Sequence, residues 1–592
     1  NSRTAGQGGR IMANSMGSLF IGVSGLKTSQ NALNITANNL ANVDTKGYVR
    51  QRVLQEDRHY LNLDPTTAVG PQQSGLGVGI ADVIHARDIF LDKVYRTHNG
   101  RHGFYSSTYE TISEVETLFG ELEGTAFQDM LTGDEGLWAA LEEFAKEPSD
   151  RINQNLVIEK ANLFVSRAQA VYKGLQTYQN NLNQQISDKI DEINDLGETI
   201  RDLNMEIMKI EAGGVETAMD LRDLRDMAID ELSKYGAVTY KELGTGIVKV
   251  SFEHVSFVDE YHAYKIEKKV DKVTGFITPY WDHLSKPAEG SYYKVYDTSE
   301  SISTARKNDI GELKALILAR GDKPSNYLDI EGISMKDYDE TVGNSVMMNI
   351  QSEFDLLVHS IVTGLNDLFA PNVYSTTDIT GTDENGNAVT IARGTKILDT
   401  KNCCVGSDEK LPPQELFVRT GCPRYKTIHG DDGNTYYVYN EEDPKDTSMQ
   451  YTTGGIRLNQ KLLESESLLP FQTQNGRPGE LPVAYELGAA IEALWKKEGM
   501  YLSPHDTTPC TFSEYYSKMT SELALLGDVF QATADGLEGT KLSTDNARQQ
   551  VIGVSSDEEL TAMVKYQSAY NASSRFMNVI SEMIETIIHQ MG

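Results

Sequence analysis

Three short patterns in the chain contain residue types that could do chemistry. His98 and His102 are four residues apart, so on a helix they would share a face and could hold a metal ion. The turn 383–386 (Asp-Glu-Asn-Gly) resembles part of a calcium loop, but its first ligand position is a glycine and the closing Glu is absent. The adjacent thiols of Cys403 and Cys404 could be redox-active. We favour a solvated histidine pair, an ordinary turn, and buried or unpaired thiols.

Two denser clusters also have a structural interpretation. The tyrosine-rich segment 436–439 could bind a ligand or a glycan, but it is typical of a half-buried strand. The run 220–226 alternates aspartate and arginine, which predicts a solvated, ion-paired helix face. The sequence contains no His-Glu-x-x-His, no G-x-S-x-G, no P-loop and no G-x-G-x-x-G after a strand. We therefore predict that the protein is not an enzyme and has no catalytic, cofactor-binding or metal-binding residues.

Composition limits the partners of the chain. Its 592 residues suggest about three to five structural units. Lys and Arg number 54 and Asp and Glu 86, so the net charge is −32, which disfavours nucleic acid and anionic membrane surfaces as partners. We find neither an apolar run of about 18 residues nor a signal peptide pattern. Residues 1–15 are Gly-rich and resemble an expression tag remnant, so we expect the native start at Met16.

A heptad near the N-terminus predicts a helix with one narrow apolar seam. Its positions are spaced alternately by four and three residues, with Ala37 as a small member and Gln30 as an interruption. The segment 42–48 that follows is rich in Asn, Asp and Gly, which end helices and form turns. The apolar members of this N-terminal seam are Leu19, Val23, Leu26, Leu33 and Leu40.

A second heptad near the C-terminus is more apolar than the first. It follows Ser555 and Ser556 and three acidic residues, which favour a helix start. A lone seam would expose apolar surface, so we expect the two terminal seams to pack together and against neighbouring subunits. The more apolar C-terminal seam should then lie innermost. Its members, apart from Ser573, are Met563, Tyr566, Tyr570, Met577, Ile580, Ile584 and Ile587.

Between the ends, helical and strand-like regions alternate. Period-two alternation over 236–300 predicts strands, and 373–512, with nine of the 16 prolines, predicts short strands and turns. A third heptad runs from Leu182 to Ile210 and stops at two glycines. The regions with helical periodicity are 105–145, 150–180, 182–210, 217–235, 309–320, 341–370 and 513–550.

These regions predict a mainly α fold with β-rich insertions. We expect an elongated, multidomain chain in which the terminal helices form a coiled-coil-like pair, a long helical rod follows, and the β domains project outward. The expected parts are the tag remnant 1–15, a terminal coiled-coil assembly domain of 16–58 plus 553–592, a helical rod of 59–235 plus 308–372 plus 513–552, a β-rich insertion 236–307 and a second β- and loop-rich insertion 373–512.

Motifs at both ends resemble the bacterial flagellar axial protein family. The N-terminal match includes Asn39, Leu40, Asn42, Thr45, Gly47 and Tyr48. The C-terminal match includes Asp557, Glu558, Glu559 and Gln567. Within the family, Arg50-Gln51, the long helical region 105–235 and the Gly-Glu-Leu at 311–313 favour the subunit at the first hook–filament junction. Rod proteins are much shorter, and hook proteins are β-rich after the N-terminal helix.

The resemblance implies a structural subunit of an extracellular appendage. It also implies export in an unfolded state through the flagellar type III apparatus, and a cytoplasmic chaperone that holds the C-terminal helix beforehand. The expected partners are other copies of the chain, the hook protein and the next junction protein. Two alternatives stay open: a hook protein or other axial subunit, and an axial scaffold that carries an enzymatic or adhesive insert in 373–512.

Overall fold

The computed structural model describes residues 2–58, 61–62, 73–120, 126–213, 217–474 and 481–591. For residues 2–16, 61–62, 73–74, 587 and 590–591 the description is limited to the backbone. The chain divides into two compact units, each formed by separate stretches of sequence. Unit 1 comprises Asn1–His102, Ile193–Lys265 and Gly536–Gly592, and unit 2 comprises Gly103–Glu192 and Ile266–Asp535.

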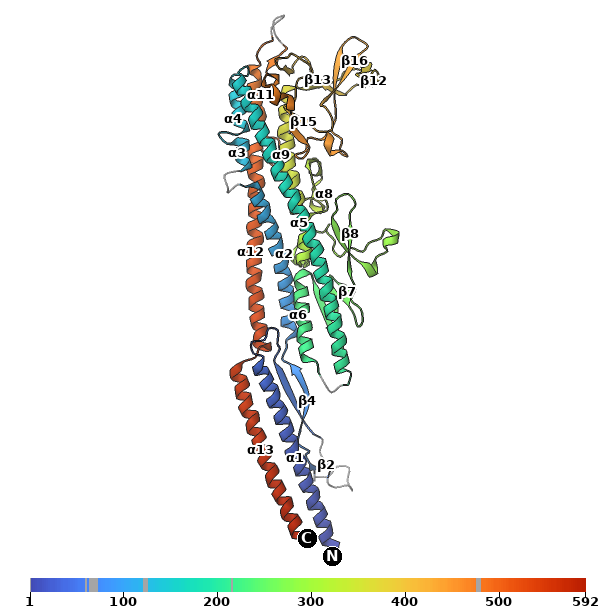
Figure 1. Ribbon diagram of the computed structural model, residues 1–592, viewed down its shortest axis with the longest axis vertical. Helices are drawn as coiled ribbons and strands as arrows, with labels where there is room; N and C mark the ends of the chain where they lie inside the picture. The colour runs from blue at the N-terminus through green and yellow to red at the C-terminus, as the bar shows by residue number, and fades with distance from the viewer. Residues whose placement is uncertain are drawn as a thin grey trace. The chain divides into compact units, whose positions relative to one another are not determined.

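Unit 1 contains both chain ends. Helices α1 (Ser2–Ala41) and α13 (Ser556–Met591) lie side by side (Figure 1). Strand β1 (Gln51–Asp57) pairs antiparallel with β4 (Val78–His85). The other elements wholly in this unit are β2 (Leu61–Asn62), β3 (Gln73–Ser74), α6 (Met219–Tyr235), β5 (Val238–Glu242), β6 (Val248–Phe252) and β7 (Val255–Val258).

Three long helices contribute residues to both units: α2 (Ile89–Phe119), α5 (Arg151–Glu211) and α12 (Phe512–Ile552). In unit 2 they surround a core of aromatic side chains that includes Phe119, Phe127, Phe164, Phe354 and Tyr516. The other helices of unit 2 are α3 (Phe127–Thr132), α4 (Leu137–Lys146), α7 (Glu312–Arg320), α8 (Met335–Glu340), α9 (Val346–Phe369), α10 (Gln460–Glu464) and α11 (Tyr485–Trp495).

The strands of unit 2 fall into small antiparallel sheets. The largest has six strands in the order β10-β13-β17-β16-β11-β12. Its strands are β10 (Asn372–Tyr374), β11 (Ile379–Asp383), β12 (Ala388–Ile391), β13 (Lys396–Leu398), β16 (Tyr425–Gly430) and β17 (Thr435–Tyr439). The two-stranded sheets pair β8 (Ile266–Val270) with β9 (Ile277–Trp281), β14 (Cys404–Val405) with β19 (Gln472–Thr473), and β15 (Phe417–Arg419) with β18 (Ile456–Leu458).

The mainly helical fold with β-rich inserted regions is confirmed, and several predicted bounds are wrong. The periodic stretches 150–180 and 182–210 form one helix, α5, of 61 residues, because no proline or turn signal interrupts them. The predicted helix 105–145 is broken into α2, α3 and α4. The N-terminal helix ends at Ala41, directly before the predicted turn 42–48, and β1 forms the end of the segment 16–58. The identity of residues 1–15 as a tag remnant stays a prediction.

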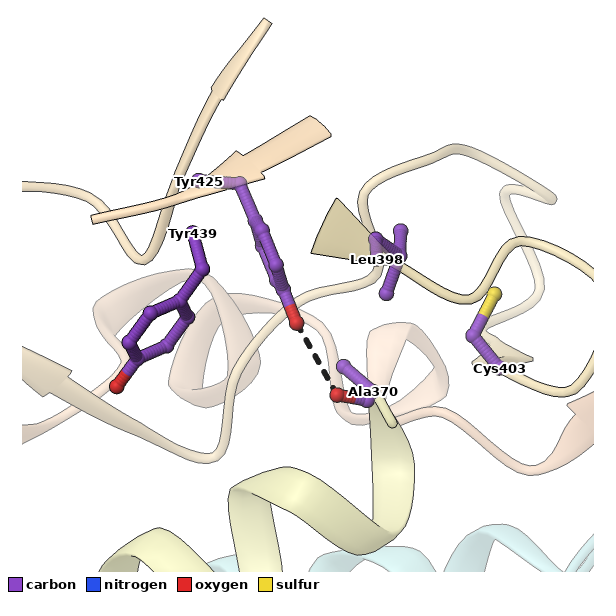
Figure 2. Close-up of a cluster of buried hydrophobic side chains, with 5 residues drawn as sticks. All are labelled: Ala370, Leu398, Cys403, Tyr425 and Tyr439. Atoms are coloured by element: carbon purple, nitrogen blue, oxygen red, sulfur yellow. Dashed lines mark hydrogen bonds between the residues drawn. The ribbon is translucent and has the colours of Figure 1, made fainter. Parts of the chain in front are cut away.

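The region 373–512 packs directly on the helices of unit 2. In Figure 2 the Tyr425 hydroxyl donates to the backbone oxygen of Ala370, just after α9, at 3.1 Å. The Asn366 side chain on α9 donates to the Phe417 oxygen at 2.8 Å, and Trp138 stacks on Trp495 with ring centroids 5.0 Å apart. The region also contains helices α10 and α11, which corrects the expectation of strands and turns alone. Its inner parts therefore complete the helical core.

Candidate assembly site at the paired termini

Small residues form the contact between α1 and α13. A Cβ atom on Gly22 would lie 2.7 Å from Cγ and Sδ of Met577, and one on Gly25 would lie 2.6 Å from the Ser573 hydroxyl. Neither space admits a larger residue without movement, so these glycines permit the close approach of the two helices. Residue numbers fall along α13 as they rise along α1, so the pair is antiparallel.

The N-terminal seam lies one residue away from this contact line. The line follows positions 22, 25, 29, 32, 36 and 39, and Ser29, Ala32, Thr36 and Asn39 on it are buried. The predicted apolar members are each only half-buried: Leu19, Val23, Leu26, Leu33 and Leu40. One residue is about 100° around a helix, so this apolar seam is offset from the line of closest approach, and its role in packing against neighbouring subunits stays a prediction. Glycine, serine and threonine allow closer packing than leucine at this contact.

The C-terminal seam does face α1, through Ser573 and Met577. Ile580 is buried, Met563, Tyr566, Met577 and Ile584 are half-buried, and Tyr570 is exposed. The side chain of Ile587 lies outside the described residues. The rest of α13 exposes large apolar side chains on its other faces: Leu560, Val564, Phe576, Val579, Met583 and Ile588. A helix that is apolar around most of its circumference normally has further neighbours.

Asn39 is the centre of the polar network that joins both chain ends. Its Nδ2 donates to the Gln51 oxygen at 3.0 Å and to Glu559 Oε2 at 3.1 Å. Its Oδ1 accepts from the Gln51 amide at 3.1 Å and from the Tyr48 hydroxyl at 2.8 Å. Asn39 is 1% exposed, and all four hydrogen-bonding positions of its amide are used. This geometry explains why an asparagine is needed at this position.

Arg50 ties the same network to the start of α13. Its Nε donates to Glu559 Oε1 and its Nη1 to Glu558 Oε2, each at 2.7 Å. The Arg50 amide also donates to the Ile552 oxygen at 2.8 Å. Both glutamates lie in the first turn of α13, where the helix dipole favours negative charge.

The remaining motif residues shape the turn after α1 or lie on the surface. Thr45 Oγ1 donates to Asn42 Oδ1 at 3.1 Å, and Gly47 has φ +82°. A side chain on Gly47 would also collide with Met227 of α6, so glycine is required twice over. Asp557 and Gln567 are exposed, and nothing in the structure explains Gln567.

The helix face at 220–226 differs from its prediction. Asp223 and Arg225 are buried, so this face is not simply solvated. Arg225 Nη1 donates to Asn204 Oδ1 at 3.1 Å and to the Gly246 oxygen at 2.7 Å. Burial lowers the pKa of Arg225 to about 10. Asp223 accepts the Val49 amide at 3.0 Å and thus contacts the segment after α1. Charge alternation alone did not reveal these contacts.

The cysteine pair, the tyrosine-rich segment and the 383–386 turn have structural roles in unit 2. Cys403 lies in the apolar cluster of Figure 2, and burial raises the pKa of its thiol to about 11 and that of Cys404 to about 12. The segment 436–439 is part of the half-buried strand β17. The Asp383 carboxylate accepts the amides of Asn385 and Asn387 within the β11–β12 turn. Among the residues that the structure describes, no three His, Cys, Asp or Glu side chains are grouped to hold a metal ion.

Two further observations concern the described residues as a whole. A cavity of about 300 Å³ lies between α7 and α9, lined by residues of the range 298–348, and so outside 373–512. None of the helices in the described ranges is long and apolar enough to cross a membrane.

Three family descriptions match successive parts of the chain. Residues 112–383 match the flagellar hook-associated protein FlgK helical domain, residues 19–48 the flagella basal body rod protein, and residues 550–590 the flagellar basal body rod FlgEFG protein C-terminal domain. The two terminal matches include all ten motif residues, and the central one includes all of α5, α6 and α9.

Individual relatives were found at full length and over short stretches. Flagellar hook-associated protein 1 of Bacillus subtilis is 24% identical over 98% of this chain and 99% of that protein. Flagellar hook protein FlgE of Borreliella burgdorferi is 39% identical over 13% of this chain and 19% of that protein. The solved flagellar hook junction protein FlgK from Burkholderia pseudomallei superposes with a TM-score of 0.48 and 11% identity, over 78% of this chain and 100% of that chain.

Proposed function

Because this chain belongs to the hook-associated protein 1 family of bacterial flagellar axial proteins, we propose that it joins hook to filament by polymerising through α1 and α13. The chain is a structural subunit of the bacterial flagellum. The observation that carries the proposed mode of assembly is the α1–α13 pair. Its inner contact includes small residues of α1, and several large apolar side chains of α13 face outward.

The exposed apolar side chains of α13 support contacts with neighbouring subunits. Burying one such side chain contributes about 1.5–3 kcal/mol. An isolated subunit leaves several of them in water, including Val564, Val579 and Met583. A ring or helical assembly of copies would cover them, with the half-exposed N-terminal seam as a complementary apolar surface.

The proposed partners follow from the position at the junction. They are other copies of the chain, the hook protein on one side and the second junction protein, hook-associated protein 3, on the other. We further propose export through the flagellar type III apparatus to an extracellular position on the flagellum. Before export, a cytoplasmic chaperone would cover the apolar faces of α13. We propose no enzymatic activity, nucleic-acid partner or membrane partner.

The alternatives are less well supported. A hook protein fits poorly because the relative matched at full length is a hook-associated protein 1, whereas the hook protein similarity covers 13% of the chain. An enzymatic or adhesive insert in 373–512 would need convergent polar groups with unusual reactivity. Cys403, Tyr425 and Tyr439 of that region are instead part of its packing.

Deletion of the gene, followed by electron microscopy, tests the proposed position. Cells without the protein should carry hooks without filaments, and a plasmid copy should restore both filaments and motility. Filaments of normal length on the deletion strain would contradict the junction role. Absence of hooks would instead indicate a hook protein.

A further inference from the structure

A short strap, residues 42–50, connects α1 to β1 and contacts two partners within unit 1. On one side, Tyr48 donates to Asn39 and Arg50 to Glu559, both in the paired termini. On the other side, the Val49 amide donates to Asp223 Oδ2 on α6. A single carboxylate therefore fastens the strap to α6 by a hydrogen bond.

The second oxygen of this carboxylate faces a histidine. Asp223 Oδ1 lies 3.5 Å from His85 Nε2, and their side chains are 8% and 11% exposed. In the described part of the chain, neither of these two atoms has a hydrogen-bond partner that would compete for the space between them. A buried carboxylate and a buried imidazole in this arrangement are both satisfied if one proton lies between them.

The charged groups around the pair do not replace that proton. Arg87 is bonded to Asp92 and Asp226, Arg222 to Glu211 and Glu242, and Arg225 to Asn204. Tyr48 and Asp220 also lie near Asp223. The other charged residues that line the same cavity as Asp223 are Lys46, Asp230, Glu231, Lys234, Asp545 and Arg548. Burial raises the pKa of Asp223 to about 7, and burial together with Arg87 lowers that of His85 to about 4.

We propose that His85 and Asp223 share one proton, carried on Asp223 Oδ1 and directed at His85 Nε2, and that this neutral pair keeps the strap fastened to α6 across mildly acidic conditions. The proposal concerns the joint inside unit 1 and does not depend on the assembly role.

Proton counting shows why such a pair resists changes in pH. When the strap is detached from α6, which we call the open state, Asp223 and His85 are hydrated and have their ordinary pKa values of 3.8 and 6.5. Between pH 3.8 and pH 6.5 the open pair therefore holds one proton, on the imidazole. When the strap is bonded to α6, which we call the closed state, the pair also holds one proton between about pH 4 and about pH 7, but this proton is on the carboxyl group of Asp223. Closing the strap therefore moves the proton and hardly changes the number bound, so the closing equilibrium is almost independent of pH.

Each residue alone would make the strap sensitive to pH, in opposite directions. In His85→Gln, Asp223 keeps its raised pKa, so protons favour the closed strap and raising the pH from 4 to 7 opens it. In Asp223→Asn, His85 keeps its lowered pKa, so lowering the pH from 6.5 to 4 opens the strap. The limiting slope in each case is about tenfold per pH unit. The double variant should show no slope.

Hydrogen–deuterium exchange of peptides covering 42–50 measures this in the full chain. Protection factors, corrected for intrinsic exchange, should be constant within about threefold from pH 4.5 to 6.5 in the wild type and in the exposed α6 control Glu231→Gln. Opposite slopes in the two single variants support the shared proton. If both single variants lowered the protection factors by the same amount at every pH, the pair would only fill space. If the protection factors of the wild type changed with pH, no proton would be shared.

A measurement on the unmodified protein guards against variants that do not fold. Exchange at the C2 position of histidine, followed by mass spectrometry, reports the pKa of each imidazole. His85 should titrate near 4 in the folded chain and near its ordinary value in denaturant. Titration of His85 near 6.5 in the folded chain would overturn the proposal.

Discussion

The helical core of unit 2 and the α1–α13 pair of unit 1 are both built from long helices, but they bury different residue types. In unit 2, Phe119, Phe127, Phe164, Phe354 and Tyr516 are nearly or fully buried, with neighbouring rings 5.0–6.2 Å apart. In the pair, Gly22 and Gly25 of α1 meet Met577 and Ser573 of α13, and several large apolar side chains of α13 are exposed.

This difference separates a region that is complete in the single chain from one that needs neighbours. Large aromatic side chains contribute most of their burial energy within unit 2 itself. Small residues contribute little burial energy, and their value lies in bringing two backbones close together. The stability of the isolated chain should therefore depend on unit 2, and assembly should depend on the outer faces of α1 and α13.

Removal of one core aromatic side chain should have the largest effect on the isolated chain. Phe354 is 0% exposed and its ring lies 5.0 Å from that of Phe127 and 5.5 Å from that of Phe119. Phe354→Ala should lower the free energy of unfolding of unit 2 by about 3–5 kcal/mol. Denaturant titration measures it, with exposed Ile152→Ala as the apolar control. Equal effects of the two substitutions would contradict a core that is complete in unit 2.

The neighbouring Glu353 should make the same core dependent on pH. Burial raises its pKa well above the usual range, although Asn349 Nδ2 donates to it at 2.8 Å. The folded chain thus holds a proton that the unfolded chain loses above about pH 4.5. The free energy of unfolding should fall as pH rises from there, by at most about 1.4 kcal/mol per pH unit.

Glu353→Gln tests this dependence because the amide keeps the shape and cannot ionise. Its unfolding free energy should stay level where that of the wild type falls, so the variant should gain stability at neutral pH. Exposed Glu331→Gln should retain the wild-type slope. A slope that is unchanged in Glu353→Gln would show that another group dominates the pH dependence.

Overfilling the terminal contact should have a smaller and local effect. In Gly25→Val the new side chain would meet the Ser573 hydroxyl, so the Ser573 side chain or the helices must shift, at a cost of about 1–3 kcal/mol. Hydrogen exchange should increase in α1 and α13 and stay unchanged in unit 2. Ala37→Val places the same side chain at an exposed position of α1 and is the control. An equal response to both would mean that the close approach of the helices is unimportant.

The sequence predicted these regions unequally, for physical reasons. Apolar periodicity predicted α13 and its side facing α1, because Met577 and Ile580 contribute to a hydropathy pattern. Gly22 and Gly25 were missed because a glycine contact has no hydropathy signal, and the N-terminal seam was therefore placed one residue away. Proline spacing indicated the irregular region 373–512, but it could not distinguish α11 from a loop.

Polar contacts between distant segments were the least predictable. The motif residues Asn39 and Glu559 are 520 positions apart, and only the fold shows that one bonds the other. Asp223 and Arg225 were read as solvated because their local pattern is that of an exposed face. A buried charge is identified by what lies opposite it, such as His85 or Asn204, and these partners come from other elements.

The last prediction concerns an outer face of α13, where the effect on the isolated chain should be smallest. Val579 is 52% exposed, so Val579→Asp should change the free energy of unfolding by no more than about 0.5 kcal/mol. In an assembly that covers Val579, the same substitution would bury an unpaired carboxylate, which is strongly unfavourable. The variant should therefore be exported but not incorporated at the junction, as measured by its recovery in sheared flagella against the culture supernatant. Asn578→Asp adds the same charge at the adjacent exposed position and should be incorporated. Incorporation of Val579→Asp at the wild-type level would show that this face of α13 remains in water after assembly, and that the single chain is already complete at its termini.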